Sequence, residues 1–531
     1  MSIRSTNSWR SRRSNAGRFC TAIFPAVVLA GCAVQPEPFA QDEHRARSVD
    51  LLQRATAGQE PLTGPVDLYE AMARAIKYNL DGRVEWMNLA LSRKELDLQR
   101  HDMLPKLVAS LDYTGRDSDA GGSSRSLLSG RTSLEPSTSS DRSVLAGELA
   151  LSWDVLDFGL SYVRAQQTAD QVNIAEERRR KVFNRLVEDV RTAYWRAVSA
   201  ERLMNQIEEL QRSTQAALEL AEQQEKVGLS SPLAPLGYQR EMLGIRRDIQ
   251  ALARELGVAK RQLGALMNLP PRTAYRVALP PTSIDWEPQP LAGGNANDGE
   301  ALLRMAIENR PELREVAYQL RSNDREATAA YLRMLPSLRV SVSSNHSDNS
   351  FLYNGNWVGW GARASWNLLN VFRLPAEQQK IRAQGQSLDH RQLALTTAVA
   401  TQVEVSQARY VLRLEEFRTA RRFHEVQVRI EAQIEAGVQV GTLGRQALIR
   451  ERMNTLVSKV RYDMALADLQ NAYANVYASL GIDPVTVEMR TTEPVASLSA
   501  KLRAMWAQRR DPAAMQEPSA PTGTAPQTPE G

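Results

Sequence analysis

The sequence predicts a mainly helical fold with a small amount of β-structure, arranged as two internal repeats. A Leu-Pro pair precedes an alternating stretch at Pro105 and again at Pro336, and a second alternating stretch leads to Trp153 or Trp366. Residues 160–227, which follow the stretch that leads to Trp153, contain neither glycine nor proline. Because self-similarity at this scale indicates a repeated structural unit, each repeat is expected to contain a helix, a β-hairpin, a long helix, a turn and a return helix.

The first residues have the pattern of an export signal. Five arginines precede an apolar run at 19–30, and a glycine and Cys32 follow. A basic segment, an apolar segment and small residues are typical of a signal peptide, which we expect at 1–31. Small residues ending in a cysteine also resemble the bacterial lipobox, which implies cleavage before Cys32 and its lipidation with palmitate. The alternative is an ordinary signal peptide with an incidental cysteine. Because Cys20 would be removed, no disulfide is expected in the mature chain.

Composition argues against several classes of function. Charged residues make up 24% of the chain and the net charge is +5, but no basic block alternates with aromatic residues as in a nucleic-acid groove. None of the five histidines pairs with another at metal-ligand spacing, and no phosphate-binding Gly-Lys-Ser/Thr loop is present. We therefore predict no enzyme activity, no cofactor, no metal and no nucleic-acid partner.

Four stretches with a period of two predict the two hairpins. They lie at 107–113, 146–153, 338–343 and 358–366. Strands of about 10 residues fit a tilted crossing of a bilayer, and aromatic residues near strand ends are typical of a membrane interface. The predicted interface aromatics are Trp153, Trp357, Trp360 and Trp366. A soluble sandwich with buried tryptophans is the alternative, although four strands alone make a poor sandwich. The polar loops at 115–143 and 345–356 are expected to be mobile.

The long helices are the second strong signal. Residues 160–227 would form a helix about 100 Å long, and 376–436 is a similar run interrupted only by Gly385. Turns containing glycine are expected at 227–232 and 436–441, each followed by a return helix. A coiled-coil seam is predicted from the spacing of Phe183, Val187, Val190, Tyr194, Ala197 and Met204.

The organisation of the whole chain follows from these elements. The lipidated tether is expected at 32–65, the first repeat at 66–269 with its opening helix at 66–103, the linker at 270–298, the second repeat at 299–485, and a largely disordered tail at 486–531.

Together these residues resemble the TolC-type outer-membrane efflux channels, in the lipoprotein branch of that family. The resemblance spans roughly 66–485. It rests on the order of several features, each of low specificity: the lipobox, the two Leu-Pro pairs, the Trp-Asp and Trp-Asn pairs at Trp153 and Trp366, the Asn-Arg-Pro-Glu-Leu segment at 309–313, and the paired glycine turns.

The resemblance implies a homotrimer in the outer membrane with a helical body in the periplasm. Four strands per protomer would close a 12-strand β-barrel, and the long helices would form a trimeric α-helical barrel. The apolar strand faces would meet lipid, and the face with Arg339, Ser341, Ser343 and Arg363 would meet water. The chain would then be a passive multidrug or small-molecule efflux duct, working with a periplasmic adaptor protein and an inner-membrane transporter, which we expect to be proton-driven.

The same resemblance places the glycine turns at the periplasmic tips, where the adaptor would bind. The corresponding residues are Gly228, Leu229, Ser230, Gly437, Val438 and Gln439. Such channels often carry acidic residues after the second turn, but none occurs at 436–450, where Arg445 stands. We hypothesise an aperture at Arg445 that is not cation-selective; the alternative is that Arg445 only faces solvent.

Two other functions remain open. One is a duct of the same fold serving type I protein secretion, which the sequence does not distinguish from drug efflux. The other is a periplasmic coiled-coil scaffold lipoprotein, which would explain Cys32 and the long helices but not the four alternating strands.

Overall fold

The computed structural model describes residues 37–133, 135–227, 233–279, 298–482 and 492–508. The chain divides into two units, 1–57 and 58–531. In the first unit, α2 (Gln41–Thr56) lies within the segment expected to be a tether without regular structure. Acidic residues in its first turn and Arg54 in its last turn suit the helix dipole, and none of its residues is buried, so α2 lacks the apolar period that predicts the other helices. The predicted signal peptide and Cys32 lie outside the described residues.

In the second unit, the helix expected at 66–103 is two helices, α3 (Leu68–Tyr78) and α4 (Leu80–His101). The break is at Asn79, which is extended and whose side-chain oxygen accepts a hydrogen bond from the Gly82 amide at 3.1 Å. An asparagine that caps a new helix competes with continuation of the previous one. The interruption therefore arises from a polar side chain and not from glycine or proline.

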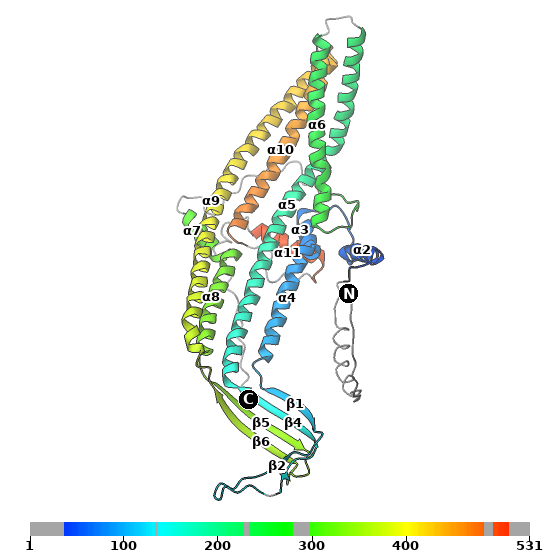
Figure 1. Cartoon of the computed structure of the whole chain (residues 1–531). Coiled ribbons are helices and arrows are strands. Elements are labelled where there is room, and N and C mark those ends of the chain that lie inside the picture. Colours follow the sequence, from blue (N-terminus) through cyan, green and yellow to red (C-terminus); the bar gives the residue numbers. More distant parts are fainter. Residues whose placement is uncertain (1–36, 134, 228–232, 280–297, 483–491, 509–531) are drawn as a thin grey trace, which may run out of the picture. The chain divides into compact units, whose positions relative to one another are not determined.

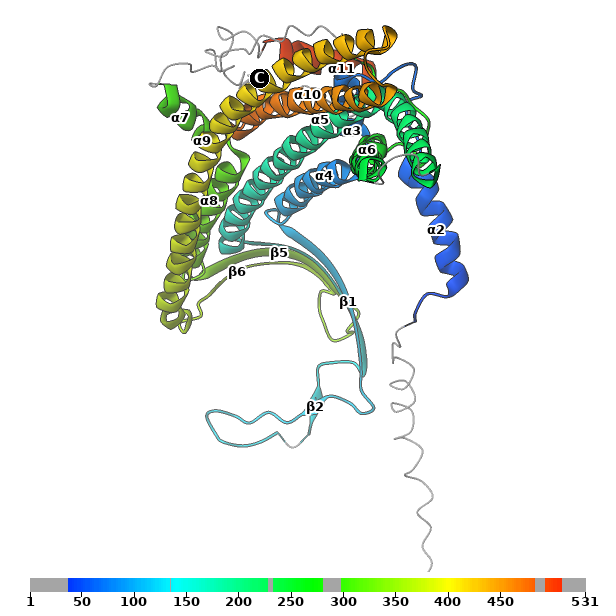
Figure 2. The same ribbon diagram turned by 90° about the horizontal axis from the view of Figure 1, so that it is seen from above.

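Four strands form one antiparallel sheet in the order β1-β4-β5-β6, and Figure 2 shows that this sheet is curved. The strands are β1 (Lys106–Gly115), β4 (Ser143–Asp154), β5 (Ser337–Ser347) and β6 (Asn356–Ser365). The loop between β1 and β4 contains a small ribbon of β2 (Gly121–Gly122) and β3 (Ser137–Thr138), which the prediction of a mobile loop did not include.

The long helices extend away from the sheet in adjacent pairs (Figure 1). They are α5 (Val155–Val227), α6 (Leu233–Leu266), α9 (Asn370–Gln439) and α10 (Arg445–Ser479). With 73 residues, α5 is about 110 Å long. The predicted seam is buried from Phe183 to Ala197, while Met204 is only partly buried. Helix α9 begins before Pro375 and ends three residues beyond the expected 436.

The second half of the chain repeats the element order of the first. Helices α7 (Asp298–Asn309) and α8 (Pro311–Leu332) precede the β5–β6 hairpin. They are separate helices because Pro311 has no amide hydrogen to continue α7 but suits the first position of α8. None of the helices in the described ranges is long and apolar enough to cross a membrane.

The tail expected at 486–531 contains α11 (Val495–Gln508), so the prediction of a largely disordered tail is wrong for these residues. Leu498 and Leu502 are fully buried, and Trp506 is 6% exposed. They join the largest apolar core with Met72 of α3 and Val190 of α5. Burying two leucines and most of a tryptophan stabilises this helix by several kcal/mol, which outweighs the polar and Pro-rich composition around it.

Candidate functional site: a two-faced sheet and a helical turn

One face of the four-stranded sheet is apolar across its whole width. Leu107 pairs with Leu151, Leu151 with Val342, and Val342 with Trp360. These side chains are 64%, 47%, 51% and 87% exposed in chain order. A continuous and largely exposed apolar row of this kind indicates contact with an apolar environment or a partner.

The opposite face of the sheet is polar. Ser152 pairs with Ser341, and one row further Arg339 pairs with Arg363. The Arg339 Nε also lies 3.8 Å from a carboxylate oxygen of Asp154. The alternation predicted from the sequence is therefore present in the register of all four strands, and the sheet separates an apolar from a polar side.

The four predicted interface tryptophans do not share one position. Trp153 and Trp360 lie on the apolar face, whereas Trp357 pairs with Asn345 on the polar face. Residues an odd number apart point to opposite faces of a strand, so Trp357 cannot lie on the same side as Trp360. Trp366 follows the last residue of β6, and its Nε1 donates a hydrogen bond of 2.9 Å to a backbone carbonyl between α8 and β5.

The turn between α9 and α10 is compact, and two glycines, Gly437 in the last turn of α9 and Gly441 after it, have different roles there. Gly441 has φ +77° and follows the helix as the usual left-handed residue, while the Thr442 amide donates to the Gly437 carbonyl at 2.9 Å. A Cβ on Gly437 would lie 2.6 Å from Leu443 Cδ1, so this glycine allows Leu443 to fold back over the helix. Val438 and Gln439 are helical and not part of the turn itself. The predicted tip residues Gly228, Leu229 and Ser230 lie outside the described residues.

The aperture candidate Arg445 is the first residue of α10. The carboxylates nearest this turn in sequence are neutralised by ion pairs. Glu435 lies 2.8 Å from Arg452, and Glu451 lies 3.5 Å from Arg450. No acidic residue occupies the first turn of α10, although the helix dipole favours one there. The described part of the turn therefore has no uncompensated negative charge.

Two buried carboxylates connect α5 to other helices. Asp170 of α5 is fully buried and accepts hydrogen bonds from Arg321 and Arg325 of α8. Asp463 of α10 is 5% exposed and accepts from Arg202 of α5 at 2.9 Å. Burial raises the pKa of Asp463 although Arg202 acts in the opposite direction.

His424 of α9 lies beside the second of these pairs. Its ring stacks on Tyr462, with ring centroids 5.9 Å apart and planes inclined by 19°. Burial first, and then Lys459, lower the pKa of His424 below its usual 6.5, while Asp463 and Glu425 oppose the change. This histidine therefore favours its neutral form more than a free imidazole does.

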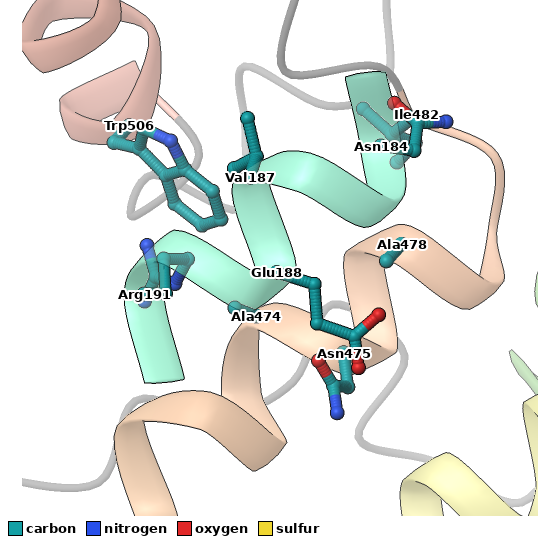
Figure 3. A pocket seen from close by; sticks show the side chains of 9 residues that line it. All are labelled: Asn184, Val187, Glu188, Arg191, Ala474, Asn475, Ala478, Ile482 and Trp506. Atoms are coloured by element: carbon teal, nitrogen blue, oxygen red, sulfur yellow. The ribbon is translucent and has the colours of Figure 1, made fainter. Parts of the chain in front are cut away.

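The hollow in Figure 3 has a volume of about 20 Å³, which is room for about one water molecule. It lies between α5, α10 and α11, with the Arg191 guanidinium 4.3 Å from the centre of the Trp506 ring. Its lining consists of Asn184, Val187, Glu188, Arg191, Ala474, Asn475, Ala478, Ile482 and Trp506. The hollow is a packing feature where α11 meets the long helices and is too small for a solute. Within the described residues no group of histidine, cysteine or carboxylate side chains could hold a metal ion.

Comparison with known proteins identifies the type of fold. Residues 72–269 match the family model described as "Outer membrane efflux protein". The matched part, which contains β1, β4, α5 and α6, is thus similar to that family. The resemblance to outer-membrane channels predicted from the sequence is therefore confirmed.

Solved channel structures share this fold. The Campylobacter jejuni CmeC outer membrane channel is 12% identical, with a TM-score of 0.60, 88% of this chain and 96% of that chain covered. The open state of the Neisseria gonorrhoeae MtrE outer membrane channel is 16% identical, with a TM-score of 0.59 and coverages of 78% and 89%. The Vibrio cholerae outer membrane protein VceC is 10% identical, with a TM-score of 0.57 and coverages of 78% and 96%. These similarities show the fold of this chain.

Sequence reasoning missed two features of the site. The first is the direct pairing of Arg339 with Arg363, which requires the register of β5 and β6. Counting outward from the loop between them could have suggested it. The second is the pair of buried carboxylates, Asp170 and Asp463, whose partners are more than 100 residues distant in sequence. No local signal marks such a pair.

Proposed function

We propose that this chain is one protomer of a trimeric outer-membrane duct for small-molecule efflux. The observation that carries the proposal is the sheet, which exposes an apolar face on one side and a polar face on the other. Its edge strands, β1 and β6, are 10 residues each, and their outer backbone groups have no partner strand in the described chain. In a bilayer every backbone polar group must be paired.

Closure by three copies satisfies both requirements. Four strands per chain give 12 in a trimer, whereas the smallest barrels made by one chain have about eight. β6 of one protomer would pair with β1 of the next, with the apolar face toward lipid and the polar face toward a water-filled lumen. A periplasmic coiled-coil scaffold would leave the apolar sheet face unexplained.

The remaining parts of the proposal follow the same architecture. The helical body would lie in the periplasm, with residues 228–230 and 437–439 contacting an adaptor protein that connects the duct to a proton-driven inner-membrane transporter. The signal peptide at 1–31 and lipidation of Cys32 would place the chain in the outer membrane. The duct itself would be passive and driven by that transporter.

Disulfide cross-linking of the edge strands tests the proposal. The only native cysteines are Cys20 and Cys32, so new cysteines in the sheet give an unambiguous signal. The double variant Ala109→Cys in β1 with Ala362→Cys in β6 places both thiols on the apolar face. After oxidation, or with a short bis-maleimide that tolerates a shift in register, we expect a covalent species of three chains in outer-membrane extracts.

The matched control replaces one edge with an inner strand. Leu149→Cys in β4 lies on the same apolar face and pairs only with Ala109 and Ser344 of its own chain, so with Ala362→Cys it should yield no cross-linked trimer. A double-edge variant that stays monomeric, or a chain that is released from membranes without detergent, would contradict the proposal.

A further inference from the structure

The polar face of the sheet carries its positive charge in the two rows nearest the helices. Asp154, Arg339 and Arg363 form one row across β4, β5 and β6. Lys106 of β1 lies in the next row, which continues through Ser152. These rows contain three positive groups and one negative group, a net charge of +2 per chain.

The distal part of the same face has the opposite sign. Asp112 pairs with Ala146, and Glu148 pairs with Ser110 and Asn345. These two carboxylates give a net charge of −2 per chain. The face is therefore polarised along the strands, positive where the sheet meets the helices and negative toward the loops.

The arginine pair is unfavourable unless its charge has a use. Like charges directly opposite each other destabilise an antiparallel pair. Asp154 lies 3.8 Å from Arg339, but the Arg363 side chain has no hydrogen bond or ion pair to any described residue. The neighbouring positions are small: a Cβ on Gly361 would meet only Ser341 Oγ, at 3.9 Å. Both guanidinium groups are therefore open to whatever occupies this side of the sheet.

We propose that Lys106, Arg339 and Arg363 form a cationic collar that binds anionic solutes, with carboxylate, phosphate or sulfate groups, as they enter the sheet-lined part of the duct. The inference rests on the proposed function, because only three-fold closure brings nine positive and three negative groups around one lumen. Rings of arginine and lysine are the usual basis of anion preference in pores. A guanidinium pair also presents parallel donors that suit carboxylate and phosphate oxygens.

The collar predicts anion preference that depends on salt. The Debye length is about 10 Å at 0.1 M salt and about 3 Å at 1 M, so the collar should act across the lumen only at low ionic strength. In planar bilayers with a KCl gradient centred on 0.1 M, the reversal potential should show chloride to be more permeant than potassium. The preference should largely disappear near 1 M.

Single substitutions separate the collar from the rest of the duct. Arg363→Gln should lower the chloride-to-potassium permeability ratio about two-fold and Arg363→Lys should retain it, while Glu148→Gln should raise it. Arg116→Gln removes the same charge just beyond β1, outside the two rows, and is the matched control that should leave the ratio unchanged. Because Arg363→Gln removes a like-charge pair, it should not lower the melting temperature.

Binding is tested directly with tripolyphosphate added to one side of the bilayer. It should block the current of the wild-type duct in brief events, with at least a three-fold lower apparent affinity in Arg363→Gln, whereas the cation spermine should not discriminate between the two. If channels form but the wild type prefers potassium, or Arg363→Gln and Arg116→Gln behave alike, the collar is wrong and the duct stands. If no channels form, the proposed function fails and the collar with it.

Discussion

Two glycines at the ends of the second pair of long helices provide a controlled test of the packing. Gly441 follows α9 and Gly481 follows α10, with φ of +77° and +72°. In both cases the amides of the glycine and of the residue after it donate to carbonyls in the last turn of the helix, which is the Schellman arrangement. The two sites differ in their surroundings. A Cβ on Gly441 would meet nothing within 4 Å, whereas a Cβ on Gly481 would lie 2.7 Å from the backbone carbonyl carbon of Asn309.

The difference sets the expected magnitudes. An L-residue in the left-handed region costs about 1–2 kcal/mol relative to glycine, so Gly441→Ala should destabilise the protein by about 1 kcal/mol. Gly481→Ala has the same backbone cost and in addition an overpacking cost of about 1–3 kcal/mol. Its clash is with backbone where α10 meets the α7–α8 junction, and backbone does not move aside as a side chain can. We therefore expect a loss of about 2–5 kcal/mol.

Thermal unfolding followed by far-ultraviolet circular dichroism, in one detergent and at one protein concentration, measures the ranking. The decrease in melting temperature should be at least twice as large for Gly481→Ala as for Gly441→Ala. Asparagine separates the two causes because it tolerates the left-handed region. Gly441→Asn should be close to wild type, and Gly481→Asn should remain strongly destabilised. Equal shifts for the two alanine variants, or recovery in Gly481→Asn, would refute the reasoning.

Three further predictions concern other parts of the chain. Because the folded-state pKa of His424 lies below 6.5, the unfolded chain binds the proton more readily than the folded chain. The melting temperature should therefore fall as pH decreases below about 6.5, and His424→Gln should flatten this decline. A parallel decline in both proteins would show that the pH dependence does not arise from His424. Asp170→Asn should lower the melting temperature more than Arg321→Gln, because Asp170 is fully buried and Arg321 is 49% exposed. The same thermal assay measures both variants. The opposite order would contradict a stabilising role for the buried Asp170 carboxylate. Cys32→Ser should abolish incorporation of labelled palmitate while leaving oligomers on a native gel, and continued labelling would exclude Cys32 as the lipidation site.

The alternation of side chains predicted the sheet well, because a strand that separates two environments must place apolar and polar residues on opposite faces. Leu107, Leu151, Val342 and Trp360 were assigned to apolar faces separately, and the register brings them into one row. The absence of glycine and proline likewise predicted α5, since few other signals end a helix. These are local properties, and one sequence is sufficient to reveal them.

Two differences from the predictions, at α11 and at Asn79, have a common cause, which is that tertiary packing or a polar cap outweighed composition. α11 was assigned to a disordered tail because its neighbours are rich in proline and alanine, yet Leu498 and Leu502 are buried in a core built mainly by other helices. The break at Asn79 depends on one side-chain hydrogen bond. Trp357 was grouped with the other interface tryptophans, although its offset from Trp360 already placed it on the polar face.

Helix α5 connects these observations, because it contacts most of the other long elements of the second unit. Its Asp170 is bonded to α8 near the sheet, and its Arg202 is bonded to Asp463 of α10 further along. Removing one partner of a buried ion pair leaves a charge without compensation, which typically costs about 3–5 kcal/mol. The two halves of the chain are therefore fastened together at two levels of one helix. Any movement of α9 and α10 relative to α5 must break the Arg202–Asp463 pair or carry Arg202 with it. Both arginines bonded to Asp170 come from α8, the helix that leads directly into β5. The contact at Asp170 is therefore the more rigid reference for the position of the sheet.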